Sequence, residues 1–190
     1  REEVIKQLPQ RTVEYRRIRP TEEQLDLHNG HKQTVSSILS KRYISEMDLL
    51  RLQRALLMCR LAADSTYLVT KEEPGYSSKL EELAELLPEI LADPSRKIVL
   101  FSEWTTMLNL IEALIPDGTG WVRLDGSVPQ KKRQALVHQF QKDPVCKLFV
   151  TTNAGSTGLN LQAASGAGVQ AGRTVADLGV EAVITGHVGP

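Results

Sequence analysis

The amino-acid sequence predicts an α/β fold, with a parallel sheet between two layers of helices. Three observations predict it. Short apolar runs that suit buried strands occur at 97–102, 121–124 and 146–152. Amphipathic helical patterns separate these runs, and such an alternation favours right-handed crossovers between parallel strands. A mostly helical segment precedes them, so an N-terminal helical extension is expected.

The extension, residues 1–75, is expected to open with a short strand that ends at Pro20. Thr21 and Gln24 have the spacing of a capping box, which predicts the start of a helix, and Gly30 is expected to weaken that helix. Ser45 is the expected N-cap of a further helix. Its apolar residues predict a stripe that is buried on more than one side: Met47, Leu49, Leu50, Leu56, Leu57 and Leu61.

Residues 76–165 are expected to form the main domain. Ser78 and Glu81 have capping-box spacing, so a helix is predicted to begin at Ser78. The run at 97–102 predicts the first strand, and the apolar residues from Met107 to Ile115 predict the next helix. A strand over 121–124, a helix that starts near Pro129 and a strand over 146–152 complete this zone.

Polar loops follow all three expected strands, with the sequences FSEW at 101–104, LDGS at 124–127 and TTNAGSTG at 151–158. Ligands of parallel sheets sit beyond the carboxyl ends of the strands, so the three loops are expected to open on one edge. The glycines at 155 and 158 would let backbone N–H groups approach an anion, and small hydroxyls are common donors to the phosphate backbone.

Composition narrows the function classes. The formal net charge is zero, so any nucleic-acid or membrane site must be local. The sequence has no apolar run long enough for a transmembrane helix, and no membrane partner is expected. Cys59 and Cys146 lack metal-ligand spacing and the chain shows no signal peptide. We therefore expect reduced thiols, no metal site and a cytoplasmic location.

Residues 96–165 resemble the second RecA-like lobe of a Swi/Snf-type ATPase, a relative of superfamily-two helicases. The shared features are a strand followed by FS, the LDGS turn with a helix that carries Arg133, and the loop TTNAGSTGLNL, in the family's order. Upstream, RLQRALLMCRLAADSTYLV and SSKLEELAELL resemble the family's helical bridge, and residues 21–50 its helical protrusion. The resemblance covers about residues 1–165.

The resemblance implies roles for individual residues. Gly155, Gly158 and Asn160 are expected to face the cleft where nucleotide bound to the first lobe meets the second. Arg133 is expected either to line that cleft or to be structural. Ser102 and Thr152 are expected to contact the DNA backbone. Glu103 stands where the family often has Gln, which weakens the expectation of a DNA contact at its loop.

The family hydrolyses ATP with magnesium, but this chain is not expected to do so alone. It contains no G-x-x-x-x-G-K-[ST] phosphate loop and no acidic magnesium motif, and phosphoryl transfer depends on both. Its expected partners are double-stranded DNA and a first RecA-like lobe. Arg173 resembles part of the family's arginine-finger motif, but Ala176 occupies the place of the second arginine.

The last 25 residues, 166–190, closely resemble a segment of the nitrogenase-cofactor biosynthesis (NifX/NifB-like) family, so a chimera joined at 165/166 is expected. They predict a helix and then a strand over 181–185 that completes the sheet. By that resemblance His187 would be a metal or cluster ligand, although a lone histidine is more often a surface residue. Three functions stay open: the lobe of a DNA translocase, a structural chimera without activity, and a carrier of a metal cofactor.

Overall fold

The computed structural model describes residues 11–152, 168–171 and 180–187. The chain divides into two compact units. One comprises 17–82 with 173–180, and the other comprises 1–16, 83–172 and 181–190. The division into 1–75, 76–165 and 166–190 stays a prediction.

The first unit contains a helical hairpin made by α2 (Glu22–Leu39) and α3 (Glu46–Asp64), followed by the short α4 (Thr66–Thr70). Both predicted caps are confirmed. Thr21 and Gln24 close a capping box on α2, and Ser45 with Asp48 closes one on α3. Gly30 lies inside α2 without interrupting it.

The predicted burial of the leucine stripe on α3 is wrong. Met47 and Leu50 are 66% and 59% exposed, and Leu49, Leu56 and Leu57 are exposed as well. The buried residues of α3 are instead Asp48, Ala55, Ala62 and Asp64. A helix in a two-helix hairpin covers one stripe against its partner, and small alanines allow close approach there.

The helix α5 (Ser78–Leu91) begins as predicted, but its cap is Ser77 rather than Ser78. The hydroxyl of Ser77 accepts the N–H of Leu80, with 3.2 Å between the two atoms. Ser78 makes a tertiary contact instead: its N–H donates to the side-chain oxygen of Gln24 over 3.1 Å. Sequence spacing could not separate these two serines, since either can cap a helix.

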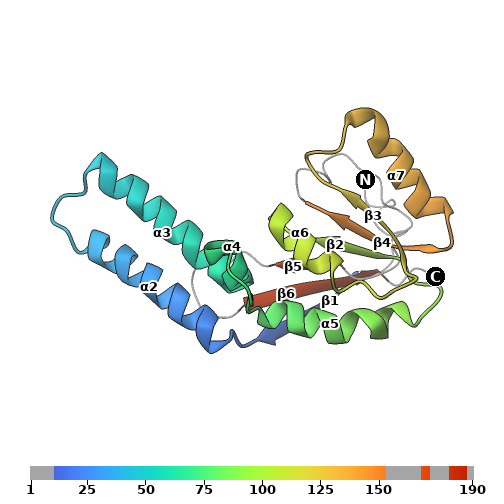
Figure 1. The fold of residues 1–190 in the computed structure, drawn as a ribbon, viewed down its shortest axis with the longest axis horizontal. Coiled ribbons are helices and arrows are strands. Elements are labelled where there is room, and N and C mark those ends of the chain that lie inside the picture. Colours follow the sequence, from blue (N-terminus) through green and yellow to red (C-terminus); the bar gives the residue numbers. More distant parts are fainter. Residues whose placement is uncertain (1–10, 153–167, 172–179, 188–190) are drawn as a thin grey trace, which may run out of the picture. The chain divides into compact units, whose positions relative to one another are not determined.

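The second unit is built on a sheet with the strand order β1-β6-β5-β2-β4-β3 (Figure 1). Its strands are β1 (Arg11–Ile18), β2 (Ile98–Phe101), β3 (Gly120–Leu124), β4 (Cys146–Thr151), β5 (Gly168–Ala171) and β6 (Val180–His187). The strand β4 lies between β2 and β3 and pairs in parallel with both. The predicted α/β class, parallel pairing and strands are thereby confirmed.

Helices cover both faces of this parallel core. The helix α7 (Gln130–Lys142) places Phe140 in a buried cluster with Val99, Val122, Leu124, Cys146 and Phe149. The helix α6 (Thr105–Glu112) is bonded to Arg123, which alternates with Val122 and Leu124 along β3. Successive side chains of a strand point to opposite faces, so α6 and α7 lie on opposite sides of the sheet.

The tail departs from its prediction. A helix was expected directly after residue 165, whereas 168–171 form β5, which pairs in parallel with β2. The expected strand is present as β6, but it pairs antiparallel with β5. Small residues such as Gly168 and Ala171 carry little periodicity, so the pattern could not distinguish a helix from a strand.

Candidate nucleic-acid interface

The carboxyl ends of β2, β3 and β4 meet at one edge of the sheet, as parallel pairing requires. Two hydrogen bonds join them. The N–H of Ser102, just past β2, donates to the carbonyl of Thr151 over 3.1 Å. The hydroxyl of Thr151 donates to the carbonyl of Leu124 at the end of β3 over 2.6 Å. The three strand ends are therefore held as one structure.

The polar residues at this edge are almost fully buried in the described structure. Ser102 is 3% exposed, Thr152 is 4% exposed and Thr151 has no exposed surface. The hydroxyl of Ser102 also accepts the N–H of Trp104 at 3.2 Å, which orders the start of the loop before α6. The bond to Trp104 fixes the position of the Ser102 hydroxyl, and both Ser102 and Thr152 have little exposed surface in the described structure. Their expected contacts with DNA stay a prediction.

The turn after β3 leads into α7 and is tied to it. The N–H of Val128 donates to the carbonyl of Asp125 over 3.2 Å. The Nε of Arg133, in the first turn and a half of α7, donates to the carbonyl of Val128 over 3.1 Å. This contact gives Arg133 a structural role in the turn. Its alternative role as a residue of the nucleotide cleft stays a prediction.

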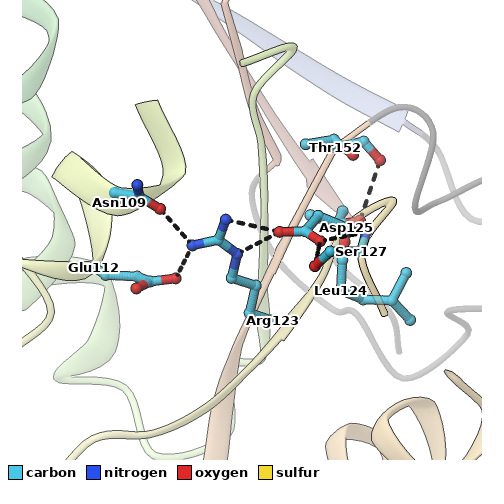
Figure 2. A network of polar contacts seen from close by, with 8 residues as sticks. Asn109, Glu112, Arg123, Leu124, Asp125, Ser127 and Thr152 are labelled. Atoms are coloured by element: carbon cyan, nitrogen blue, oxygen red, sulfur yellow. Dashed lines mark hydrogen bonds and ion pairs between the residues drawn. The ribbon is translucent and has the colours of Figure 1, made fainter. Parts of the chain in front are cut away.

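Arg123 lies at the centre of an ionic network that the sequence analysis missed (Figure 2). Its Nη1 donates to Glu112 Oε1 over 2.6 Å and to Asn109 Oδ1 over 2.7 Å, both on α6. Its Nε and Nη2 each lie 2.7 Å from Asp125 Oδ2. The sequence shows the R-x-D spacing at the end of a strand and the i, i+3 spacing of Asn109 and Glu112. Only the fold brings these two pairs of residues into contact.

Asp125 is a buried carboxylate whose charge is compensated. It is 3% exposed, and its second oxygen accepts the N–H and the hydroxyl of Ser127 over 2.9 and 2.5 Å. The hydroxyl of Ser127 lowers the pKa of Asp125, with further lowering by the N–H of Ser127 and by Arg123, against the effect of burial. Burial lowers the pKa of Arg123, but the bonds to Glu112 and Asp125 outweigh it and leave that pKa raised. Both groups are ionised at neutral pH.

Several predicted residues lie outside the described part of the chain. These are Gly155, Gly158, Asn160, Arg173 and Ala176. His187 is the last residue of β6, and its side chain is also outside the described set. Within residues 11–152, 168–171 and 180–187, no three His, Cys, Asp or Glu side chains are grouped so that they could hold a metal ion. None of the helices in these ranges is long and apolar enough to cross a membrane.

Comparison with known proteins assigns part of this structure. Residues 78–166 match the family described as the helicase conserved C-terminal domain. The chain is 30% identical over 140 residues to the ATP-dependent helicase FUN30 of Saccharomyces cerevisiae, over 72% of this chain and 12% of that protein. It is 36% identical over 111 residues to the ATP-dependent helicase fft2 of Schizosaccharomyces pombe, over 57% of this chain and 9% of fft2.

The structural comparison agrees. The C-terminal domain of the Sulfolobus solfataricus SWI2/SNF2 ATPase superposes with a TM-score of 0.67 at 25% identity, covering 78% of this chain and 66% of that one. Residues 78–166 are a helicase C-terminal domain of the SWI2/SNF2 type. The predicted resemblance is confirmed to this extent, together with the fold of the second RecA-like lobe. The ATPase core of the same organism in complex with double-stranded DNA superposes with a TM-score of 0.63 at 24% identity, covering 78% of this chain and 32% of that one.

The SWI2/SNF2-type domain corresponds to only part of the length of its relatives. This chain spans about a tenth of the curated helicases named above, since it covers 12% of FUN30 and 9% of fft2. The family match ends at residue 166. The comparisons give no evidence for a nitrogenase-cofactor segment after that residue or for a join between two families.

Proposed function

We propose that this chain supplies the DNA-backbone contacts and one wall of the nucleotide cleft in an ATP-dependent DNA translocase. One observation carries the proposal: the ends of β2, β3 and β4 are bonded into a single edge, and Ser102 and Thr152 lie at this edge. The names of the relatives support it, since FUN30 and fft2 are ATP-dependent helicases. A structural relative, the Sulfolobus core, is described in complex with double-stranded DNA.

The chemistry of this edge suits binding that does not depend on base sequence. Small hydroxyls and backbone N–H groups donate to phosphate oxygens, which position a protein on DNA without reading its bases. A translocase needs such contacts because it must move along any sequence. Ser102 follows β2 and Thr152 follows β4, so two neighbouring strand ends would each supply one donor.

For the nucleotide side, Gly155, Gly158, Asn160 and Arg133 are proposed to face ATP that is bound by a separate lobe. When bound there, ATP with magnesium would supply the phosphoryl group, and the metal would neutralise its developing charge. The described residues contain no group of acidic side chains suited to a metal, so no magnesium step is assigned to them. Arg133 would keep the turn before α7 in place through the carbonyl of Val128.

Direct binding measurements test the DNA contacts. Ser102→Ala and Thr152→Val in the 190-residue chain should each weaken binding to a short duplex by roughly fivefold, because each removes one donor. Ser95→Ala is the matched control, since it removes an exposed hydroxyl that bonds only its neighbour Asp93 in the described structure. Fluorescence anisotropy gives the dissociation constants. Variants that bind as tightly as the wild type would count against the proposed edge.

A further inference from the structure

The guanidinium of Arg123 connects two elements that sequence places apart. It bonds Asn109 and Glu112 on α6 through Nη1, and Asp125 in the turn after β3 through Nε and Nη2 (Figure 2). The side chains of Arg123 and Glu112 retain 24% and 27% of their exposure, whereas that of Asp125 retains 5%. The Arg123–Asp125 pair is therefore more desolvated than the Arg123–Glu112 pair, and its contribution to stability depends more on good geometry.

Asp125 transmits this contact to the turn. Its Oδ2 is held by Arg123, and its Oδ1 accepts two bonds from Ser127. With both oxygens engaged, the carboxylate cannot rotate without breaking a bond to one side. Leu124, between the two charged residues, accepts the hydroxyl of Thr151 through its carbonyl. The position of Arg123 is therefore linked to the bonded strand ends.

The positive charge of the Arg123 guanidinium has a second role, which is to compensate the charge of Asp125. A buried carboxylate beside an edge that receives phosphate would repel it, and at short range such a repulsion is large. Arg123 compensates the charge of Asp125 from the side of the carboxylate that faces α6. Ser127 and the strand ends lie on the opposite side of this carboxylate. The four bonds use Nε, Nη1 and Nη2 in the planar fork of arginine, which lysine does not have.

We propose that Arg123 is a positioning residue that locks the turn 125–128 between α6 and the strand ends. By holding the turn, Arg123 keeps this edge in the geometry that binds the DNA backbone. The statement about DNA rests on the proposed function. Arg123 itself is assigned no contact with DNA or nucleotide. Removing it should loosen the turn and weaken DNA binding together, while the rest of the sheet stays folded.

Hydrogen exchange of the turn amides tests the lock in the full 190-residue chain without DNA. In Arg123→Met, the amides of Ser127 and Val128 should exchange roughly tenfold faster than in the wild type, because the acceptor groups of Asp125 are no longer held. Arg96→Met is the matched control, since Arg96 forms an exposed pair with Asp93. That variant should exchange like the wild type at both amides.

A second variant separates positioning from mere stability. Arg123→Met leaves a buried unpaired carboxylate, and adding Asp125→Asn removes that charge, so the thermal midpoint of the double variant should recover. Its turn amides should still exchange fast, because the link to α6 is absent. Slow exchange in the double variant would overturn the inference, since the loss would then be one of charge alone. If Arg123→Met does not fold, Arg123→Lys, which keeps the charge without the fork, should show fast exchange at the same two amides.

Binding to a short DNA duplex completes the test and keeps the two claims apart. If the wild type binds, Arg123→Met should bind about tenfold more weakly and Arg96→Met should bind normally. Equal binding and equal exchange in Arg123→Met would overturn the inference while leaving the proposed function intact. A wild type that does not bind DNA would overturn the proposed function, and the exchange rates would still decide whether Arg123 locks the turn.

Discussion

Gln24 joins three segments of the helical unit through one buried amide. Its Nε2 donates to the carbonyl of Ala62 on α3 over 2.9 Å, and its Oε1 accepts the N–H groups of Thr21 and Ser78. Only 1% of the residue is exposed. The sequence predicted the local bond to Thr21, because it lies three residues away. The bonds to Ala62 and Ser78 depend on the fold and left no local signal.

Replacing Gln24 with Ala should therefore be costly. The change leaves the carbonyl of Ala62 and the N–H of Ser78 without their partner, and it should lower the free energy of unfolding by about 2–4 kcal/mol. Urea denaturation followed by circular dichroism measures this change. The control is Gln33→Ala, an exposed site on the same helix. Equal stability of Gln24→Ala and Gln33→Ala would show that the hydrogen bonds of Gln24 do not contribute to the free energy of unfolding.

Asp48 makes the same unit sensitive to acid. Its carboxylate bonds to Lys41 Nζ over 2.6 Å and caps α3 with Ser45, and these bonds, led by that to Lys41, lower its pKa to about 2. A carboxyl group with a lowered pKa stabilises the fold above its unfolded pKa of about 3.9 and loses this effect as the pH falls. Stability should thus decrease between about pH 4 and pH 2.

Denaturation midpoints across that pH range test the role of Asp48. In Asp48→Asn, which cannot ionise, the decrease should be smaller than in the wild type. The exposed Asp26 offers a control on α2, and Asp26→Asn should leave the decrease closer to that of the wild type. Identical pH profiles for Asp48→Asn and the wild type would assign the acid sensitivity to other groups.

At the scale of elements, patterns that depend on neighbours in sequence were predictable. The alternation of strands and helices from β2 to β4 and the caps of α2 and α3 follow from local spacing. Burial was harder to predict, because it depends on how many sides of a helix find a partner, as the exposed stripe of α3 shows. The strand order could not be read either, since β4 inserts between β2 and β3.

Two glycines should respond to alanine with opposite signs. Gly30 lies inside α2 with open space where a Cβ would stand, so Gly30→Ala should raise the free energy of unfolding by about 0.5–1 kcal/mol. Gly120 opens β3 at the point where its register with β4 shifts, and a Cβ there would lie 2.5 Å from the carbonyl oxygen of Val145. Gly120→Ala should therefore lower that free energy by about 1–3 kcal/mol.

Chemical denaturation of both variants checks this pair. Both variants replace a glycine with an alanine, so a difference between their free energies of unfolding reflects the local environment of each glycine. An unchanged or higher stability of Gly120→Ala would show that β3 and β4 do not approach so closely at Val145. A loss of stability in Gly30→Ala would indicate that α2 needs flexibility at that position.

At the scale of the whole molecule, the site was only partly predictable. The edge formed by the strand ends followed from the alternation of elements, whereas Ser102 and Thr152 were named from the resemblance to the Swi/Snf family. Arg123 and Asp125 were missed as a pair, because α6 supplies half of their network. The join at 165/166 and the cytoplasmic location stay predictions, and a metal ligand at His187 stays an open alternative; the parent gene, imaging and a metal assay would test them.

The 190-residue chain should not hydrolyse ATP. It contains no phosphate loop and no acidic magnesium motif, and without them the phosphoryl group is neither held nor neutralised. Phosphate release should stay at background with or without duplex DNA. Turnover that disappears in Gly155→Ala or Arg173→Ala would contradict this expectation, because it would locate a complete site within the chain.

The most direct test of the account is the dependence of DNA affinity on salt. Contacts with phosphates release counterions, so the logarithm of the binding constant falls with the logarithm of salt concentration by about 0.9 per neutralised phosphate. For a single lobe that binds only the backbone, we predict weak binding to duplex DNA that falls steeply as salt rises and does not depend on base sequence. Nanomolar affinity at physiological salt, or an affinity that salt leaves unchanged, would contradict the account.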